Sequence, residues 1–204
     1  DASLENGRRI YLASDCATCH ASHQGPLGGE ENDEVLGGGK RFDTPFGIFY
    51  ATNISPHKTK GIGSWSLKTF DRAMRQGVAP SKIWPDGMNL YPVFPYTSYQ
   101  RLTPEDVRDL YAYMMTLPEV EDAPPPHELS FPFNLRRGVG VWRLVFLDGK
   151  SAEDIGVSTK DLPQAIDHEV FRKGRYLVES AAHCVECHSP RGLAGNIPKK
   201  LRYA

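Results

Sequence analysis

Two short motifs account for every cysteine in this chain: C-A-T-C-H at residues 16–20 and C-V-E-C-H at residues 184–188. Two cysteines separated by two residues and followed directly by histidine are the attachment pattern of c-type haem. The thiols form thioethers with the haem vinyl groups, and the histidine is an axial ligand of the iron. The sequence therefore predicts two covalently bound haem groups. The predicted attachment residues are Cys16, Cys19, Cys184 and Cys187, and the predicted axial ligands are His20 and His188.

Other cysteine chemistries explain these motifs less well. A zinc ribbon places its cysteine pairs about 15–20 residues apart, whereas most of the chain separates these two. A redox-active C-x-x-C pair is expected in βαβ context, but residues 3–15 are predicted to be helical. A disulfide framework is typical of exported proteins, but it gives neither histidine a role. Covalent haem explains the cysteines and the histidines together.

Composition sets the class of protein. The chain has 204 residues, with 24 Lys+Arg against 25 Asp+Glu, and this balance gives no indication of a nucleic-acid partner. No apolar run is long enough to cross a bilayer. The chain begins at Asp1 without Met or a signal-peptide pattern. Since bacterial haem attachment follows export, we expect a mature periplasmic protein whose signal peptide has been removed.

Helical signals recur in three segments. Ser3 is a candidate N-cap for a helix over 3–15, and apolar spacing predicts helices over 66–77 and 103–117. Residues 21–63, with an acidic run at 30–34, and residues 78–102 are predicted to be loops. Helix, haem motif, long loop, helix, loop and final helix is the order of a class I cytochrome c domain. The predicted fold class is therefore all-α, with long loops around attached haem.

The predicted domain organisation is uneven. Residues 1–120 would form a first cytochrome c domain, and 121–165 a connector whose apolar segments pack on that domain or on a partner. Residues 166–204 would begin a second domain, because Gly174-Arg175-Tyr176 echoes Gly7-Arg8 and Tyr11. Only 16 residues follow His188 (204 − 188). We expect either a fragment or a second site that another polypeptide completes.

Several longer segments carry a family resemblance. They are T-P-F-G-I-F-Y-A-T-N-I-S-P at 44–56, G-I-G-S-W-S at 61–66, L-Y-P-V-F-P-Y at 90–96, F-P-F-N-L-R at 131–136 and C-H-S-P-R at 187–191. With the haem motifs, they cover nearly the whole chain. Together they resemble the multihaem cytochrome c subunits of periplasmic dehydrogenase complexes.

The resemblance implies electron transfer. Such subunits accept electrons from a dehydrogenase catalytic subunit that oxidises alcohols, aldehydes or sugars, and pass them towards quinone or a terminal oxidase. Membrane association would come through a partner or through a segment beyond residue 204. The resemblance also implies a haem environment in or beside the shared segments, with loop stabilisation as the equal alternative. Its predicted members are Arg41, Asn53, Trp65 and Tyr91.

The sixth ligand of the first haem is a separate question. Many relatives have Met where this chain has Phe94, and Phe cannot bind iron. Met88 lies in the loop between the last two predicted helices, where a class I domain finds its ligand, so we predict Met88 at that position. Met74 and Met114 fall on apolar helix faces and are predicted to be core. Another Met, His57 or an open iron site remain as alternatives.

Two rival functions follow from the same residues. An open first haem would suit a dihaem enzyme acting on peroxide or another small oxidant. A gas or redox sensor would need an output domain, and the sequence contains none. We predict no catalytic side chain, and an electron carrier rather than an enzyme.

Overall fold

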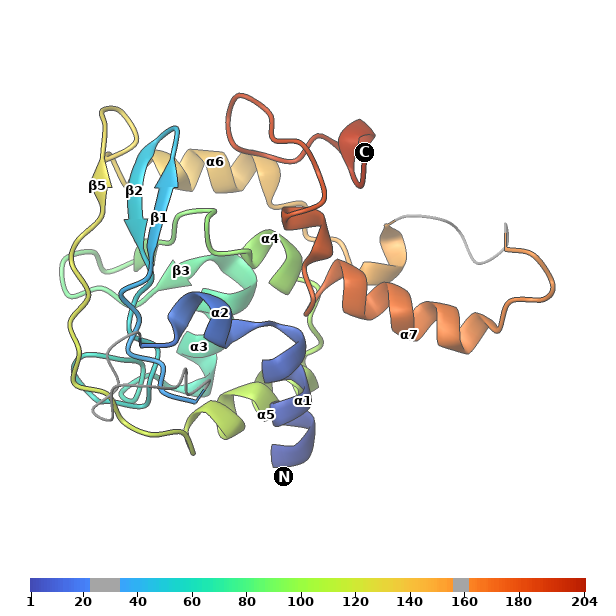
Figure 1. Ribbon diagram of the computed structural model, residues 1–204, viewed down its shortest axis with the longest axis horizontal. Coiled ribbons are helices and arrows are strands. Elements are labelled where there is room, and N and C mark those ends of the chain that lie inside the picture. The colour runs from blue at the N-terminus through green and yellow to red at the C-terminus, as the bar shows by residue number, and fades with distance from the viewer. Residues whose placement is uncertain (23–33, 156–161) are drawn as a thin grey trace. The chain divides into compact units, whose positions relative to one another are not determined.

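A computed structural model describes residues 1–22, 34–155 and 162–204 (Figure 1). The acidic run predicted at 30–34 lies outside the described residues, except for Glu34. Contacts divide the chain into two compact units. Unit 1 contains Asp1–Phe70 and Glu105–Gly138, and unit 2 contains Asp71–Pro104 and Val139–Ala204. The domains expected at 1–120, 121–165 and 166–204 stay a prediction.

Two crossed helices form the core of unit 1. Helix α1 (Leu4–Ala13) begins where the Ser3 hydroxyl accepts a hydrogen bond from the Asn6 N–H at 3.2 Å, and α5 (Pro104–Met114) begins with proline. The helices approach closely at Gly7, where an added Cβ would lie 2.1 Å from the Asp109 carbonyl oxygen. The Asn6 amide donates to the Asp109 carboxylate at 3.0 Å. Close backbone packing and a polar clamp therefore fix this crossing.

A small antiparallel sheet completes unit 1 (Figure 1). Its order is β1 (Arg41–Thr44), β2 (Gly47–Tyr50) and β5 (Glu128–Leu129). Gly47 has a φ of +119°, and a Cβ there would lie 2.4 Å from the Glu128 carbonyl oxygen. Only glycine combines that backbone angle with so close an approach of β5.

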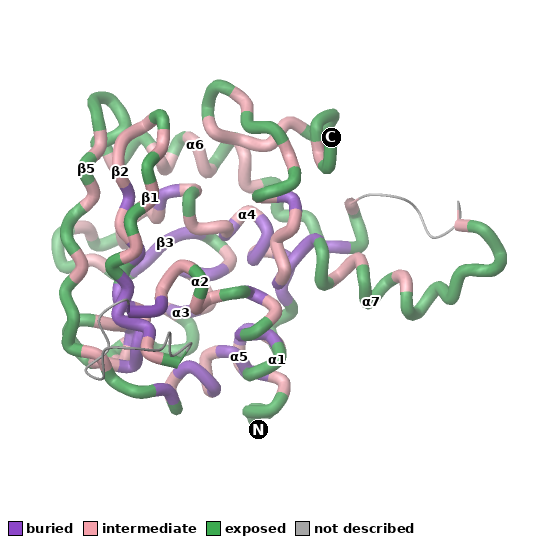
Figure 2. The backbone as a smooth tube through the Cα atoms, in the orientation of Figure 1, coloured by how far each residue is buried: buried purple, intermediate pink, exposed green. Residues whose placement is uncertain are grey.

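Unit 2 contains short elements joined by long connections. In chain order they are the end of α3 (Leu67–Gln76), β3 (Val78–Ala79), β4 (Met88–Asn89), α4 (Tyr96–Tyr99), α6 (Gly138–Phe146, from its second residue), η1 (Ala152–Asp154), α7 (His168–Glu179), η3 (Cys184–Glu186) and η4 (Lys199–Leu201). The Asp167 carboxylate caps α7 by accepting from two backbone N–H groups. Figure 2 shows α7 as exposed or half-buried along most of its length, and Glu179 is its one buried residue.

The three helices predicted over 3–15, 66–77 and 103–117 are confirmed as α1, α3 and α5. Helix makes up 37% of the chain and strand 7%, so the all-α expectation describes the helices but omits two small sheets. One of them, β3 paired with β4, lies in the predicted loop over 78–102. Strands of two to four residues are too short to show a sequence period, and they form by pairing, locally in β1–β2 and β3–β4 and over a long separation in β2–β5.

The predicted connector also contains a helix. In α6 the Trp142 and Phe146 rings lie 4.9 Å apart, while Val141, Leu144 and Val145 are exposed. The expectation that this segment packs on the first domain or on a partner stays a prediction. Among the helices described, none has the length and hydropathy required to cross a membrane.

Candidate haem-binding sites

The first motif lies on a helical turn directly after α1. Asp15 adopts a left-handed conformation (φ 50°, ψ 39°), which separates α1 from α2 (Cys16–His20). Residues three and four positions apart share a helix face, so Cys19 and His20 lie close to the face that carries Cys16. The turn therefore presents two thiols and one imidazole together, as the predicted attachment requires.

A backbone carbonyl orients His20. The Nδ1 atom of its ring lies 2.7 Å from the Thr52 carbonyl oxygen, which can only accept a hydrogen bond. Nδ1 therefore carries the proton, and Nε2 has the lone pair that binds a metal. Burial lowers the pKa of His20 and the bond to Thr52 opposes that shift. The neutral imidazole favoured by burial is the form that can ligate iron.

A glycine run holds the carbonyl that orients His20. The Gly38 N–H donates to the His20 carbonyl oxygen at 2.8 Å, and the Gly39 N–H donates to the Ala51 carbonyl oxygen at 2.9 Å. Gly38 has a φ of +76°, and a Cβ there would lie 2.6 Å from the Thr52 carbonyl oxygen. The chain can pass between the motif and Thr52 because this position has no side chain.

Asn53 holds the other side of the same loop. Its side chain is buried, and its amide nitrogen donates to the carbonyl oxygens of Val120 at 2.7 Å and Asp122 at 3.0 Å. Its amide oxygen accepts from the Ser55 N–H and hydroxyl at 2.9 and 2.7 Å. Asn53 therefore braces the loop next to Thr52, and its contact with haem stays a prediction.

The cysteines show which other chemistries the structure supports. All four lie in described residues, and none of them forms a disulfide. Burial, with the negative charge of Asp15, raises the pKa of Cys16 to about 12, so this thiol stays protonated at neutral pH. Across residues 1–22, 34–155 and 162–204, no three His, Cys, Asp or Glu side chains are grouped to hold a metal ion. The disulfide and zinc alternatives therefore gain no support.

The second motif has the same local backbone entry. His183 is left-handed (φ 38°, ψ 35°), as Asp15 is before the first motif, and the 3₁₀ turn η3 then begins at Cys184. Val185 is buried, whereas Cys187 and His188 are exposed. The His183 ring meets the Tyr99 ring edge-on with centroids 5.6 Å apart. The motif therefore rests on α4 on one side and leaves its predicted iron ligand open to solvent.

The remaining predicted haem-environment residues have other contacts. Arg41 is exposed and pairs with Asp43 at 2.7 Å. The Trp65 carbonyl oxygen accepts from the Tyr111 hydroxyl at 2.7 Å, and the buried Tyr91 accepts at its carbonyl from the Phe94 N–H at 3.0 Å. The first contact lies within β1 and the others hold the segments around Trp65 and Tyr91, and a contact of Arg41, Trp65 or Tyr91 with haem stays a prediction.

The two methionines that were predicted to be core residues are buried, and Met88 is not. Met74 and Met114 are buried, which confirms them as core residues. Met88 is half-buried in β4, paired with Ala79 of β3. Since Met88 belongs to unit 2 and the first motif to unit 1, its role as sixth ligand stays a prediction.

Sequence reasoning missed three features of these sites. Thr52 contributes only its carbonyl, which no residue type signals. The left-handed residues before the motifs, Asp15 and His183, are not glycines, so their backbone angles were not expected either. The run of three glycines at 37–39 was the available signal, because glycine marks positive φ and close backbone approach.

Comparisons with known proteins give one family. The sequence profile of cytochrome c matches residues 4–118. The fructose dehydrogenase cytochrome subunit of Gluconobacter japonicus is 40% identical over 194 residues, which cover 93% of this chain and 35% of that protein. A diheme cytochrome c-type protein of Cereibacter sphaeroides is 43% identical over 189 residues, covering 93% of this chain and 58% of that protein.

A third relative has a similar coverage. The cytochrome c subunit of the quinone alcohol dehydrogenase of Gluconacetobacter polyoxogenes is 36% identical over 197 residues, covering 95% of this chain and 37% of that protein. The chain thus spans less than two thirds of the length of each of these relatives.

Proposed function

Because the chain belongs to the cytochrome c family, whose profile matches more than half of its residues, we propose that it carries electrons between a dehydrogenase subunit and a later acceptor. The family implies covalently bound haem c. The observation that carries the proposal is the first motif, where His20 is oriented by the Thr52 carbonyl within a turn that also presents both cysteines. We propose that the chain binds two haems, each in a cytochrome c fold of the class I type.

The cysteines and the histidine of each motif would have different roles in holding the haem. The two cysteines would hold the macrocycle covalently, and the histidine would ligate its iron through Nε2. When bound, the haem supplies an iron that gains and loses one electron. The protein contributes a fixed ligand geometry, because Gly38 and Asn53 fix the loop that carries the Thr52 carbonyl. A ligand that does not move between oxidation states keeps the reorganisation small.

The proposed partners follow from the relatives. These relatives are named as cytochrome subunits of fructose, gluconate and alcohol dehydrogenases. We therefore propose a dehydrogenase catalytic subunit as the electron donor. Quinone or a downstream cytochrome or oxidase is the proposed acceptor, and the periplasm the proposed location. The relatives give no support to a dihaem enzyme acting on peroxide.

The test is the haem content and visible spectrum of exported protein. The pyridine haemochrome should give two c-type haems per chain, and Cys16→Ser with Cys19→Ser should leave one. Full reduction by a sugar or alcohol dehydrogenase with its substrate would support the carrier role. Absence of haem in correctly exported protein would overturn the proposal.

Met88 is the proposed sixth ligand of the first haem, supported by its place between the last two helices of the family order. A sulfur-to-iron charge-transfer band in the near-infrared spectrum of the oxidised protein would be expected. Met88→Ala should remove it, whereas Met115→Ala should not. Retention of the band in Met88→Ala would exclude this residue.

A further inference from the structure

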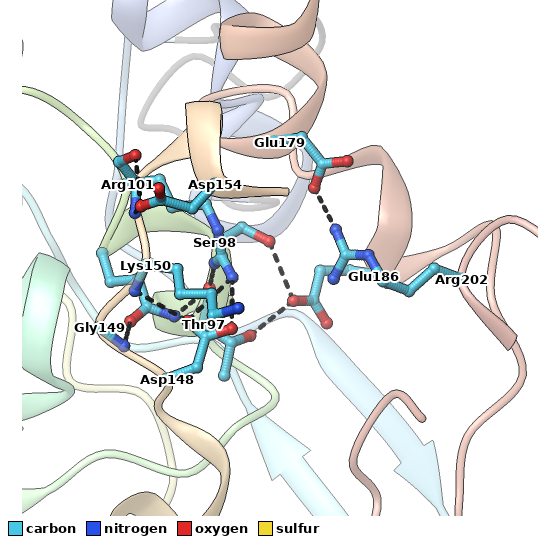
Figure 3. Close-up of polar contacts among 12 residues, drawn as sticks. Thr97, Ser98, Arg101, Asp148, Gly149, Lys150, Asp154, Glu179, Glu186 and Arg202 are labelled. Atoms are coloured by element: carbon cyan, nitrogen blue, oxygen red, sulfur yellow. Dashed lines mark hydrogen bonds and ion pairs between the residues drawn. The ribbon is translucent and has the colours of Figure 1, made fainter. Parts of the chain in front are cut away.

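Glu186, between the two cysteines of the second motif, has the most extensive long-range contacts of that motif. Its side chain is only 8% exposed. One carboxylate oxygen accepts from the Thr97 hydroxyl at 2.7 Å and from the Ser98 hydroxyl at 3.1 Å. The other oxygen pairs with the Arg191 guanidinium at 2.8 Å. Figure 3 shows the carboxylate directed at Thr97 and Ser98 of α4.

The corresponding position of the first motif is Thr18, and its setting is different. Thr18 is exposed and donates to the Asp15 carboxylate, three residues away, at 2.6 Å. The second motif thus has a buried carboxylate with partners 88 and 89 residues away, where the first has a neutral, exposed hydroxyl with a local partner. The cysteines and histidines of the two motifs match, so this position is where their charge differs.

The charges around Glu186 are arranged as pairs. Arg101, which is buried, pairs with Asp148 at 3.2 Å and donates to the Thr97 carbonyl oxygen. Arg202 pairs with Glu179. Figure 3 shows both pairs beside Glu186. Each of these two arginines has its own carboxylate, and that of Arg191 is Glu186. Removing the Glu186 charge would therefore leave the local net charge one unit more positive.

We propose that Glu186 positions the second haem-binding motif on α4 and lowers the midpoint potential of the haem bound there. The proposal rests on the function proposed above, because it needs a haem on Cys184 and Cys187. Oxidised haem carries one more positive charge than reduced haem, so a nearby buried carboxylate stabilises the oxidised form. The potential governs how readily this haem would gain one electron from the proposed dehydrogenase donor, a step in which no bond is made or broken.

This assignment rests on a difference between the motifs at one position. Thr18, between the cysteines of the first motif, is neutral, so the lowering of the potential by Glu186 has no counterpart at that position of the first motif. The Tyr99–His183 ring contact is a second contact between the motif and α4. It should keep the side chain at position 186 in place when Glu186→Gln removes the charge. The charge can therefore be tested apart from the position.

The experiment is a spectroelectrochemical titration of the full haem-loaded chain. Glu186→Gln keeps the size and one acceptor oxygen but removes the charge, so the midpoint potential of haem two should rise while that of haem one stays unchanged. The variant that lacks Cys16 and Cys19 assigns the remaining component to haem two. Thr18→Val is the matched control at the same position of the first motif, and it should leave the potential of haem two unchanged.

A second variant separates charge from structure. Thr97→Val with Ser98→Ala removes the two hydroxyl donors but keeps the carboxylate, whose charge is then less dispersed, so the potential of haem two should fall. A merely structural role would move both variants in the same direction. An unchanged or lowered potential in Glu186→Gln with two haems bound would overturn the proposal. A wild-type chain with fewer than two haems would instead count against the proposed function.

Discussion

The two haem-binding motifs share a local structure and differ in what surrounds it. Each follows a helix, each is preceded by a left-handed non-glycine residue, Asp15 or His183, and each begins its helical turn at a cysteine. Beyond that turn they diverge. His20 is fixed by the Thr52 carbonyl, while His188 is exposed and has no hydrogen-bond partner for its ring in the part of the chain that the structure describes.

The preceding helices show the same contrast. Gly7 of α1 is pressed against α5, where an added Cβ would meet the Asp109 carbonyl at 2.1 Å. Gly174 is its counterpart in α7, and among the described residues no atom lies within 4 Å of a Cβ built there. The same sequence element is thus a packing contact in one unit and an exposed helical position in the other. Local sequence specifies the turn, and tertiary packing specifies what fixes it.

The largest expected effect tests this contrast between the helices. Gly7→Ala should destabilise unit 1 by about 2–3 kcal/mol, because a methyl group must displace backbone in a packed crossing. Gly174→Ala should stabilise α7 by about 0.5–1 kcal/mol, because alanine is the better helix former. Hydrogen exchange measured by mass spectrometry on α1 and α7 reports each helix separately. Equal effects at the two glycines would contradict the difference.

The next effect concerns the carbonyl that orients His20. Gly38→Ala and Gly39→Ala both place alanine at positive φ, +76° and +96°, but only the first meets the Thr52 carbonyl. Both variants carry backbone strain, and Gly38→Ala should cost about 1–2 kcal/mol more because of the clash. It should also shift the midpoint potential of haem one in a spectroelectrochemical titration, because the hydrogen bond to Nδ1 tunes the histidine ligand.

Gly39→Ala is the control for strain alone and should leave that potential unchanged. If the two alanine variants are indistinguishable in stability and potential, the glycine run does not hold Thr52. The potential of haem two should stay constant in both, because its histidine depends on no such carbonyl.

The smallest effect is a pH dependence confined to unit 1. Burial, with the charge of Arg136, lowers the pKa of His127, whose Nδ1 accepts from the Tyr50 N–H at 3.2 Å. The unfolded chain binds a proton at the ordinary value near 6.5. Folding stability should therefore fall as pH drops below about 6.5 towards the lower folded pKa, by no more than about 1.4 kcal/mol per pH unit.

His127→Asn keeps an acceptor near the Tyr50 N–H and removes the titration, so this part of the pH dependence should disappear from denaturant unfolding curves. His168→Asn, at the exposed start of α7, serves as control and should leave the dependence in place. A pH profile unaltered by His127→Asn would show that the β2–β5 region does not contribute it.

The sequence by itself predicted the haem chemistry, the family and three of the helices. Two C-x-x-C-H motifs predicted covalent haem, longer shared segments predicted the family, and the Ser3 cap with apolar spacing predicted α1, α3 and α5. These features depend on contacts within a few residues, so a linear pattern reveals them.

Only the tertiary structure decided how each motif is fixed. The close approach at Gly38 depends on its positive φ. The Thr52 carbonyl and the Asn53 side chain bond to groups 32 and 69 residues away in sequence. The same holds for Glu186, whose partners Thr97 and Ser98 are separated from it by most of unit 2. A carbonyl has no residue type, and a buried carboxylate looks like a surface one in sequence. Their roles arise from proximity in space, which follows from packing rather than from pattern.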